Sequence, residues 1–335
     1  MTASTILHLT KHHALGNDFL VLLDPDAQVD FGLEMARSLC DRHRGIGADG
    51  MIHARTGPAH ADITMTLRNA DGGMAEMSGN GIRCLAQAVV DAGLGKGPQL
   101  TIATGGGLRQ VTVEDETGSG IRRVSVDMGP ATLGPDQPQE CLGRRVRTVD
   151  LGNPHLVLLG PDPRQLEIGE LGPQMEALTP GGVNVEFVAV GPGQDELTMR
   201  VWERGVGETL ACGTGACAAA TAAYSWGLVG SNVTVHQPGG DADIELRPDN
   251  LTVHQPGGDG DIELRPDNLT VHRPAGAGAG AGTELRPGAG TAGFELSPEG
   301  ETVDPSSGAA DPAPPGSVIL SGPTQLIARI EVDWP

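Results

Sequence analysis

The chain contains two diverged copies of one set of short motifs, and this duplication restricts its fold more than any other feature. The segment GNDFLVLLDPD at 16–26 returns as GNPHLVLLGPD at 152–162, an offset of 136 residues. A glycine-rich segment repeats in the same way, since SGNG at 78–81 returns as CGTG at 212–215, an offset of 134 residues. Two nearly equal offsets predict two similar domains that face each other, each with a polar side chain where a helix begins.

Length and element pattern agree with two domains of mixed strands and helices. At 335 residues the chain can form two compact domains of ordinary size. We place the N-terminal domain at 1–130, completed by a C-terminal strand at about 328–335, and the second domain at 131–327. Strand-like and helix-like segments alternate within each half, which predicts an α/β (α+β) fold.

Hydrophobic periodicity assigns the main elements of both halves. Apolar runs and apolar–polar alternation predict strands, and apolar residues at helical spacing predict helices. The helix from Gly81 is apolar on most faces and ends before Gly93, so we expect it to be buried inside its domain. The expected strands are 20–23, 63–69, 183–190, 198–205 and 317–332, and the expected helices are 31–43, 81–92 and 215–230.

An 18-residue unit is duplicated between the second half and the C-terminal strand. NVTVHQPGGDADIELRPD at 232–249 is followed by NLTVHQPGGDGDIELRPD at 250–267 and by a decaying third copy. Each unit reads as strand, Pro-Gly-Gly turn and strand, which predicts a β-hairpin, and we assign the duplicated hairpins to 232–273. Two complete copies are fewer than a solenoid requires, so local duplication of one hairpin explains them better.

Two further features of this region carry no site in our interpretation. The segment 274–317 is rich in Ala, Gly, Pro and Ser and predicts a flexible surface insertion. His236, His254 and His272 recur with the repeat, but no Cys or second His accompanies each of them. Passive repetition therefore explains these histidines better than a metal site does.

Charge and cysteine content exclude several classes of function. The formal net charge of −21 argues against nucleic-acid binding, which needs a basic surface. The N-terminal region soon turns polar, unlike a signal peptide, and no apolar run approaches the ~20 residues of a membrane span. Five cysteines without CxxC spacing disfavour both a disulfide framework and a zinc site. We therefore expect a cytoplasmic protein with reduced thiols, no metal, and no membrane or nucleic-acid partner.

The two glycine-rich motifs predict a pair of anion-binding helix ends. A helix N-terminus has unpaired N–H groups and the positive end of the helix dipole, so it binds a carboxylate, and glycine lets the ligand approach the backbone. The same field lowers a thiol's pKa from its usual ~8.5, which predicts that Cys212 forms a thiolate. Neither motif has the lysine of a phosphate-binding GxxxxGK[ST] loop or the GxGxxG pattern of a dinucleotide site.

Two such helix ends that face each other suit chemistry on both faces of one carbon atom. A carboxylate held between them makes the neighbouring carbon more acidic, because the negative charge that develops on deprotonation is stabilised. One capping side chain can remove the proton and the other can return it from the opposite face. The motifs therefore predict inversion of a stereocentre without a cofactor.

Several segments of the chain follow one known sequence pattern. They are HALGNDF at 13–19, DRHRGIGADG at 41–50, RNADG with SGNGIRCLA between 68 and 86, GNPHLV at 152–157, NVEF at 184–187 and RVWERGVGETLACGTGACAAA at 200–220. In these segments the chain resembles the diaminopimelate epimerase family, whose fold is shared with proline racemases and phenazine-biosynthesis isomerases. The resemblance implies two similar domains, each a mixed or antiparallel sheet or barrel wrapped around a central helix. It also implies a homodimer that converts LL-2,6-diaminopimelate to the meso form without a cofactor, in lysine and peptidoglycan precursor synthesis.

The resemblance also implies roles for individual residues. Ser78 occupies the position of the family's first catalytic cysteine, and Cys212 occupies that of the second. His155 and Glu203 match positions that assist catalysis near the reacting ammonium group. Arg204 suits a distal carboxylate, because a guanidinium binds a carboxylate through two parallel hydrogen bonds. The positions that match substrate contacts are Asn17, Asn69, Gly79, Asn80, Asn153, Asn184, Glu203, Arg204, Gly213 and Thr214.

Two residues depart from the family pattern. Ser78 stands in place of a cysteine, and a hydroxyl is a far weaker acid than a thiol, so Ser78 donates a proton readily but is a poor base without help. Cys84 and Cys217 should not replace it, because their positions along the helices turn them away from the site. Gly50 stands where many family members have a glutamine that contacts substrate, a change that we expect to be tolerated.

Three functions are compatible with this sequence. The first is a diaminopimelate epimerase, and the second is another cofactor-independent amino-acid racemase or isomerase of the same fold that uses a Ser/Cys pair. The third is a non-catalytic amino-acid-binding paralogue. Retention of Arg204 and of the asparagines for the distal end favours the first, since a substrate without a second zwitterionic end would not need them. Intact His155, Glu203 and Cys212 weigh against the third.

Overall fold

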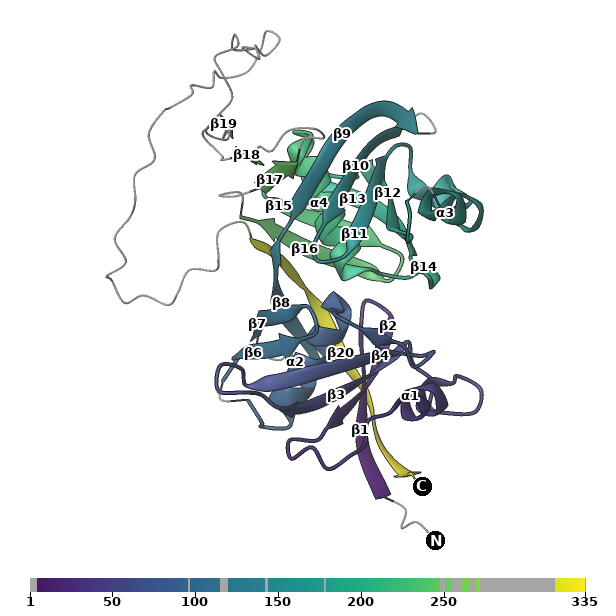
Figure 1. Cartoon of the computed structure of the whole chain (residues 1–335), viewed down its shortest axis with the longest axis vertical. Coiled ribbons are helices and arrows are strands. Elements are labelled where there is room, and N and C mark those ends of the chain that lie inside the picture. Colours follow the sequence, from purple (N-terminus) through teal and green to yellow (C-terminus); the bar gives the residue numbers. More distant parts are fainter. Residues whose placement is uncertain are drawn as a thin grey trace, which may run out of the picture.

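The structure is a computed structural model in which the chain forms two similar halves joined by one long strand (Figure 1). It describes residues 5–95, 97–114, 120–141, 144–177, 179–247, 251–254, 261–264, 269–271 and 317–334. Of the features interpreted above, His272 and the segment 274–316 lie outside the described residues.

The N-terminal half is a closed β-barrel around one helix. Its strands pair in the order β1 (Thr5–Ala14), β2 (Asn17–Leu23), β3 (Gly50–Thr56), β4 (Ile63–Asn69), β6 (Gln99–Thr104), β7 (Gly107–Val113), β8 (Ile121–Pro130) and β20 (Ser317–Trp334), and β20 returns to β1. The pairs β2–β3 and β4–β6 are parallel, and the other pairs are antiparallel. The enclosed helix is α2 (Gly79–Asp91), while β5 (Met74–Ala75) extends β4 and α1 (Leu33–Cys40) packs on β3 and β4. Because α2 is surrounded by strands, Ile82, Leu85 and Val89 are fully buried.

The C-terminal half repeats this arrangement around a second helix, α4 (Gly213–Ser225). Its strands pair in the order β9 (Thr132–Cys141), β10 (Arg144–Asp150), β11 (Pro154–Leu159), β12 (Asn184–Val190), β13 (Glu196–Glu203), β15 (Asn232–Gln237), β16 (Gly240–Leu246) and β20, with β14 (Gly207–Thr209) beside β13, and with η1 (Pro163–Gln165) and α3 (Ile168–Glu176) outside the sheet. The parallel pairs β11–β12 and β13–β15 match β2–β3 and β4–β6 of the first half. Ala218, Ala219 and Ala220 of α4 are fully buried, since small side chains let the surrounding strands approach the helix closely.

One strand holds the two halves together. The first part of β20 pairs with β16 of the C-terminal half, and its later part pairs with β1 of the N-terminal half. Over residues 317–325, which include those paired with β16, β20 also runs antiparallel to β8. In Figure 1 this strand is drawn in yellow and passes from the upper half into the lower half. The two barrels therefore share a structural element that belongs wholly to neither.

The predicted hairpins of the first two duplicated units are confirmed. The first unit forms β15 and β16, which pair antiparallel with Gln237 opposite Gly240 at the turn. The second unit forms β17 (Leu251–His254) and β18 (Asp261–Leu264), also antiparallel, and β19 (Leu269–Val271) of the third copy pairs with β18. The two complete copies take different places, because β15 pairs with β13 while β17 pairs with β9.

The helix predicted over 31–43 is too long, while the two central helices begin earlier than predicted. Helix α1 ends at Cys40 because the Asp41 carboxylate accepts hydrogen bonds from the His43 and Arg44 N–H groups, which turns the chain. Helices α2 and α4 each begin two residues before the predicted start, at the residue that follows the cap. The caps themselves are Ser78 and Cys212.

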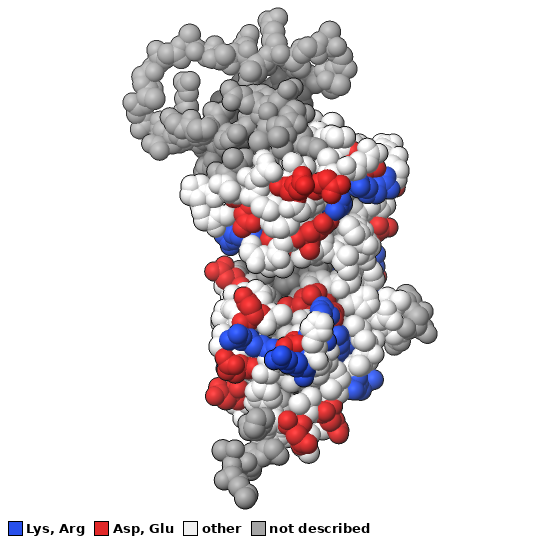
Figure 2. Space-filling view, turned by 90° about the vertical axis from the view of Figure 1, so that its right-hand side faces the viewer, with Lys and Arg blue, Asp and Glu red and all other residues white. Residues whose placement is uncertain are grey.

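Acidic and basic side chains are interspersed on the face shown in Figure 2, over both halves. Ion pairs between described residues include Arg123 with Asp243, which joins β8 to β16, and Arg200 with Glu208. Among the described residues, none of the helices is both long and apolar enough to cross a membrane.

Candidate active site

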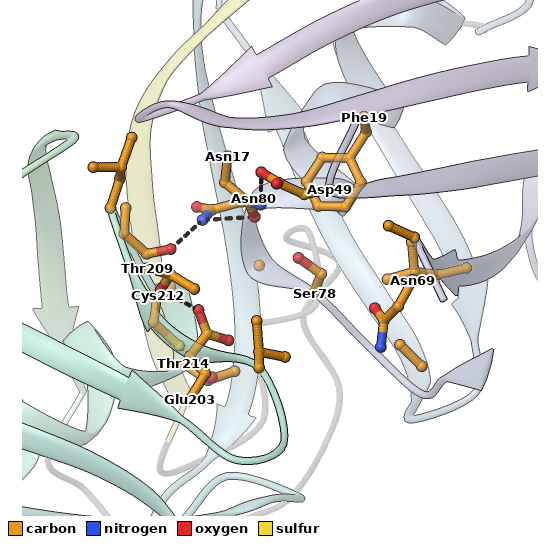
Figure 3. Close-up of a pocket in the computed structure, with 18 of the residues that line it drawn as sticks. Asn17, Phe19, Asp49, Asn69, Ser78, Asn80, Glu203, Thr209, Cys212 and Thr214 are labelled. Atoms are coloured by element: carbon orange, nitrogen blue, oxygen red, sulfur yellow. Dashed lines mark hydrogen bonds between the residues drawn. The ribbon is translucent and has the colours of Figure 1, made fainter. Parts of the chain in front are cut away.

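A cleft of about 1010 Å³ lies where the two halves meet. The N-terminal half contributes polar side chains that include Asn17, Asn69 and Ser78. The C-terminal half contributes Glu203 and Cys212, and Figure 3 shows these side chains gathered around the same space. The duplicated motifs of the sequence therefore meet at one site, as their spacing predicts.

Ser78 and Cys212 are equivalent caps of the two central helices. The Gly81 N–H donates to Ser78 Oγ at 3.0 Å, and the Gly215 N–H contacts Cys212 Sγ at 3.4 Å. In both helices the cap uses the N–H of the third helical residue, which leaves the first two N–H groups without an intrahelical partner. Those groups belong to Gly79 and Asn80 in α2, and to Gly213 and Thr214 in α4. All four residues line the cleft, so two positive helix ends point into one space.

The repeated Gly-Asn turns place one asparagine in each half beside its helix end. Gly16 has a φ of +81° and Gly152 has a φ of +92°, a conformation that glycine adopts without strain. Asn17 Oδ1 accepts from Asn80 Nδ2 at 3.3 Å, and Asn153 Nδ2 donates to the Thr214 hydroxyl at 3.4 Å. Each turn therefore fixes the second residue of the neighbouring helix. The glycines explain why this motif recurs in both halves.

The two half-sites differ in their acid–base groups. Phe19 and His155 occupy equivalent places, because each lies two residues after its turn asparagine and pairs with the first residue of the next parallel strand. Two residues farther along those partner strands, Ile52 lies near Gly81 and Glu186 lies near Gly215. At the ends of β4 and β13 stand Asn69 and Glu203.

These three equivalent pairs give the two caps opposite chemical surroundings. The half-site of Ser78 has an apolar ring, an apolar chain and a neutral amide. The half-site of Cys212 has an imidazole and two carboxyl groups. The acid–base machinery is therefore concentrated around the thiol.

A chain of hydrogen bonds connects Glu186 to Cys212. Glu186 Oε1 lies 2.7 Å from His155 Nδ1, and His155 Nε2 lies 3.1 Å from Asn153 Oδ1, with His155 and Glu186 fully buried. Asn153 contacts the Thr214 hydroxyl, which lies 3.4 Å from Cys212 Sγ. When His155 carries protons on both nitrogens, every bond from His155 onward donates toward Cys212, and this direction stabilises a thiolate.

The prediction that the helix end lowers the pKa of Cys212 is wrong. Burial raises the pKa of this thiol well above its usual value, and the nearby Glu203 and Glu186 carboxyl groups raise it further. Hydrogen bonds from Thr214 and the Gly215 N–H act in the opposite direction but do not compensate. Burial also raises the pKa of Glu203, which accepts a hydrogen bond from the Thr209 hydroxyl. Cys212 therefore rests as a thiol, next to a carboxyl group of raised pKa.

Charged residues that the sequence did not single out support the first half-site. Asp49 accepts hydrogen bonds from Asn17 Nδ2 at 2.8 Å and from Arg42 at 2.7 Å, and it lines the cleft with Arg42. Arg83 is fully buried below the start of α2, where it donates to Asn80 Oδ1 at 2.6 Å and to the Gly79 carbonyl oxygen. Its charge strengthens the positive field at this helix end. Both arginines lie inside the family motifs, and this position is the sequence feature that could have identified them as site residues.

Most of the predicted site residues line the cleft, but two do not. Those that line it are Asn17, Asn69, Ser78, Gly79, Asn80, Asn153, Glu203, Arg204, Cys212, Gly213 and Thr214. His155 lies behind Asn153, as described above. Asn184 donates to the Pro154 carbonyl oxygen and accepts from the Arg204 N–H, so its amide fixes the backbone of Arg204. Cys84 and Cys217 are fully buried away from the cleft, as predicted from their spacing, and burial raises the pKa of both thiols to about 12.

Comparison with known proteins identifies the family. The family model for diaminopimelate epimerase matches residues 9–134 and 147–258. A diaminopimelate epimerase of Synechococcus elongatus is 41% identical over 263 residues, covering 72% of this chain and 92% of the relative, and one of Pelotomaculum thermopropionicum is 40% identical over 262 residues, covering 71% and 91%. The chain belongs to the diaminopimelate epimerase family. Solved structures with this fold include a hydroxyproline epimerase from Agrobacterium vitis, with a TM-score of 0.61, 15% identity and coverage of 98% of this chain and 92% of that one. A phenazine biosynthesis protein from Bacillus anthracis has a TM-score of 0.62, 13% identity and coverage of 98% and 99%.

The two residues expected to depart from the family pattern, Ser78 and Gly50, have different structural settings. Ser78 takes the capping position on α2 with a hydrogen bond that a serine makes readily. At Gly50 an added β-carbon would lie 2.8 Å from the Arg68 carbonyl oxygen and 3.2 Å from the Phe19 ring. The Phe19 ring therefore occupies the space beside Gly50, and Phe19 itself lines the cleft.

Proposed function

We propose that this member of the diaminopimelate epimerase family converts LL-2,6-diaminopimelate to meso-diaminopimelate by two-base proton transfer at the α-carbon. The observation that carries the proposal is the convergence of two capped helix ends, with Ser78 and Cys212 as the caps, on one cleft. Both caps come from equivalent places in the two halves, so they approach a bound carbon from different sides. The relatives named above are diaminopimelate epimerases that match most of the chain.

The reacting amino-acid end binds at the helix termini. Its α-carboxylate accepts hydrogen bonds from the free N–H groups of Gly79, Asn80, Gly213 and Thr214, and the buried charge of Arg83 adds to the positive field. These donors stabilise the negative charge that spreads onto the carboxylate when the α-proton leaves. The ends of the helices therefore act on the transition state as well as on the bound substrate.

The distal amino-acid end binds on the exposed side of the cleft. Arg204 and Asn69 line the cleft and are exposed, and their side chains make no hydrogen bond to the described residues in this structure. The guanidinium of Arg204 pairs with the distal carboxylate, and Asn69 supplies both a donor and an acceptor for the distal zwitterion. Asn184 contributes by holding the Arg204 N–H at 3.0 Å. A substrate with only one amino-acid end would leave these groups without partners.

Proton transfer follows from the asymmetry of the two half-sites. Glu203 takes the proton of the Cys212 thiol, and the thiolate, a strong base because its pKa is raised, removes the α-proton. The C–H bond breaks and an S–H bond forms. Ser78 then donates its hydroxyl proton to the opposite face of the carbon, so an O–H bond breaks and a new C–H bond forms. Water returns a proton to the Ser78 oxygen, and the hydroxide that remains takes the proton that Glu203 holds. The Cys212 thiol, the Ser78 hydroxyl and the Glu203 carboxylate are then restored, and the configuration has been inverted with protein groups and water alone.

We place this reaction in the cytoplasm, in the synthesis of lysine and peptidoglycan precursors, and we propose a homodimer. Membership of the family supports these proposals. The substrate is a small molecule that fits within the cleft of about 1010 Å³.

One observation favours a second candidate, an amino-acid isomerase of this fold with another substrate. Ser78 changes the acid–base pair, and the hydroxyproline epimerase from Agrobacterium vitis has the same fold. Incubation with LL-diaminopimelate, proline and hydroxyproline, followed by chiral chromatography, separates the candidates. Formation of meso-diaminopimelate alone supports the first candidate, and inversion of proline or hydroxyproline alone supports the second. Binding of diaminopimelate without inversion of any of the three supports a non-catalytic binder.

A further inference from the structure

The first copy of the duplicated hairpin reaches into the candidate active site. Its turn follows β15, and the Gly239 N–H donates to the Leu210 carbonyl oxygen at 2.8 Å, two residues before Cys212. Pro238 lines the cleft. An added β-carbon on Gly239 would lie 1.9 Å from the Leu15 carbonyl oxygen, beside the Gly-Asn turn of the other half. The turn therefore packs between the two half-sites.

Gln237, the residue before this turn, holds the backbone of Cys212. The Cys212 N–H donates to Gln237 Oε1 at 2.8 Å, and the bond is buried. The side chain of Gln237 is only 8% exposed, and its Nε2 has no hydrogen-bond partner among the described residues. An N–H donor requires the oxygen of the amide to face Cys212, so this orientation is fixed by the bond itself. A buried amide nitrogen without a hydrogen-bond partner destabilises the fold. An apolar side chain would avoid this cost, so the presence of a glutamine indicates that its oxygen has a role.

Among the described residues, the first half-site has no equivalent of this bond. The hairpin of β6 and β7 matches that of β15 and β16, and Thr104, opposite Gly107, takes the place of Gln237. The Gly106 N–H donates to the Glu76 carbonyl oxygen as Gly239 does to Leu210, so the two turns dock alike. Thr104 instead bonds within its own turn, donating to the Gly107 carbonyl oxygen at 2.7 Å. The additional contact is made only to the half-site that carries the thiol.

We infer that Gln237 is a positioning residue for Cys212, and that the first hairpin copy is part of the active site. The bond fixes the backbone at the start of α4, so that Cys212 Sγ stays within reach of the Gly215 N–H and the Thr214 hydroxyl. The second copy repeats the glutamine as Gln255, whereas the third has Arg273, which cannot accept a hydrogen bond. The expected change in kcat rests on the proposed function. The expected change in the alkylation of Cys212 does not depend on the substrate.

The test compares Gln237→Leu with Gln255→Leu, the same substitution in the same HQPGG sequence of the other copy. Alkylation of Cys212 by iodoacetamide is followed across pH by peptide-resolved mass spectrometry, and kcat and KM are measured with LL-diaminopimelate. For Gln237→Leu we expect the alkylation midpoint to rise by about half a pH unit or more, because the displaced thiol loses donors that stabilise its anion. We also expect kcat to fall by about tenfold or more while KM changes by less than about threefold. Gln255→Leu should match the wild type in all three.

Other outcomes overturn the inference. It fails if Gln237→Leu keeps the wild-type alkylation profile, or if Gln255→Leu has the larger effect, since the second copy would then occupy the site. If Gln237→Leu does not fold, Gln237→Met provides the same test, because methionine matches the length of glutamine and is only a weak acceptor. If neither the wild type nor the variants invert diaminopimelate, but the alkylation midpoint of Gln237→Leu still lies above that of the wild type, the result would support this inference and overturn the proposed function.

Discussion

Gly79 and Gly213 meet backbone to backbone where the N-termini of α2 and α4 converge. A β-carbon on Gly213 would lie 3.3 Å from the Cα of Gly79 and 2.8 Å from Leu320 Cδ2. A β-carbon on Gly79 would lie 3.5 Å from the Cα of Gly213 and 2.7 Å from the same Leu320 atom. Leu320 belongs to β20 and is fully buried, so it has little room to move. The absence of two side chains therefore determines how closely the two anion-binding helix ends approach each other.

Gly213→Ala should push the two helix ends apart. We expect a loss of about 1–3 kcal/mol in the free energy of unfolding, as for other overpacked cores, together with a lower kcat. Gly169→Ala is the matched control, because Gly169 lies in α3 with open space around it, and that variant should keep or slightly gain stability. Shortening the opposing side chain in the double variant Gly213→Ala/Leu320→Ala should recover part of the loss. Urea unfolding that shows purely additive effects would contradict the packing described here.

Replacing Glu186 separates its charge from its hydrogen bond. Glu186→Gln keeps an acceptor for His155 but removes a negative charge that raises the pKa of Cys212. The midpoint of Cys212 alkylation should therefore move to lower pH. Glu186→Leu leaves His155 Nδ1 buried without a partner and should reduce stability by about 1–3 kcal/mol. Glu245→Gln, at an exposed ion pair with Arg247, serves as the control and should change neither property.

The raised pKa of Cys212 makes the wild-type thiol sensitive to alkaline pH. Because burial and two carboxyl groups favour the neutral thiol, its thiolate fraction is small at pH 7 and rises about tenfold per pH unit toward the pKa. Alkylation of Cys212 should therefore increase steadily from pH 7 to pH 9 without reaching a plateau. Cys84 and Cys217, which are fully buried with pKa values of about 12, should remain unmodified. A plateau in the alkylation rate of Cys212 below pH 7 would contradict this prediction. It would show that the helix end lowers the pKa of the thiol more than burial and the two carboxyl groups raise it.

Asp18 should stabilise the fold at neutral pH and lose this contribution in acid. Burial raises the pKa of this carboxyl group, but hydrogen bonds from Arg42 and Lys11 outweigh burial and hold the pKa at about 2. A lowered pKa gives stability that is present above the unfolded-state pKa of about 4 and is lost as pH falls toward 2. Asp18→Asn should cost roughly 2 kcal/mol at pH 7 and much less at pH 2, measured by urea unfolding. Asp333→Asn, at an exposed position on β20, should show no such pH-dependent difference.

Local sequence signals predicted much of the fold because they report local physics. The Gly-Asn turns need the positive φ of Gly16 and Gly152, and the hairpin of the first repeated unit needs its Pro-Gly-Gly turn. Apolar periodicity predicted the central helices, since a helix enclosed by strands is apolar on most faces. The closure of the N-terminal barrel through β20, and the pairing of β20 with β16 in the other half, depend on contacts between distant segments that the short motifs do not specify.

The parts of the site that the sequence did not predict depend on tertiary contacts. Glu186 lies between the apolar residues Val185 and Phe187 of β12, and its role is visible only once His155 is seen beside it. Gln237 lies in a repeat that has no apparent connection with the glycine-rich motifs, which lie earlier in the chain. The pKa of Cys212 was predicted with the wrong sign, because the helix end is a local feature whereas burial and the two carboxyl groups come from the assembled fold.

The central claim is that Ser78 and Cys212 transfer protons on opposite faces of one α-carbon. Proton NMR of LL-diaminopimelate in D₂O tests it directly, with the wild type, Ser78→Ala, Ser78→Cys and Cys212→Ala. The wild type and Ser78→Cys should exchange the α-proton and form the meso product, Ser78→Ala should lose inversion, and Cys212→Ala should lose both exchange and inversion. Inversion by Cys212→Ala at the wild-type rate, or by Ser78→Ala at the wild-type rate, would contradict the two-base assignment.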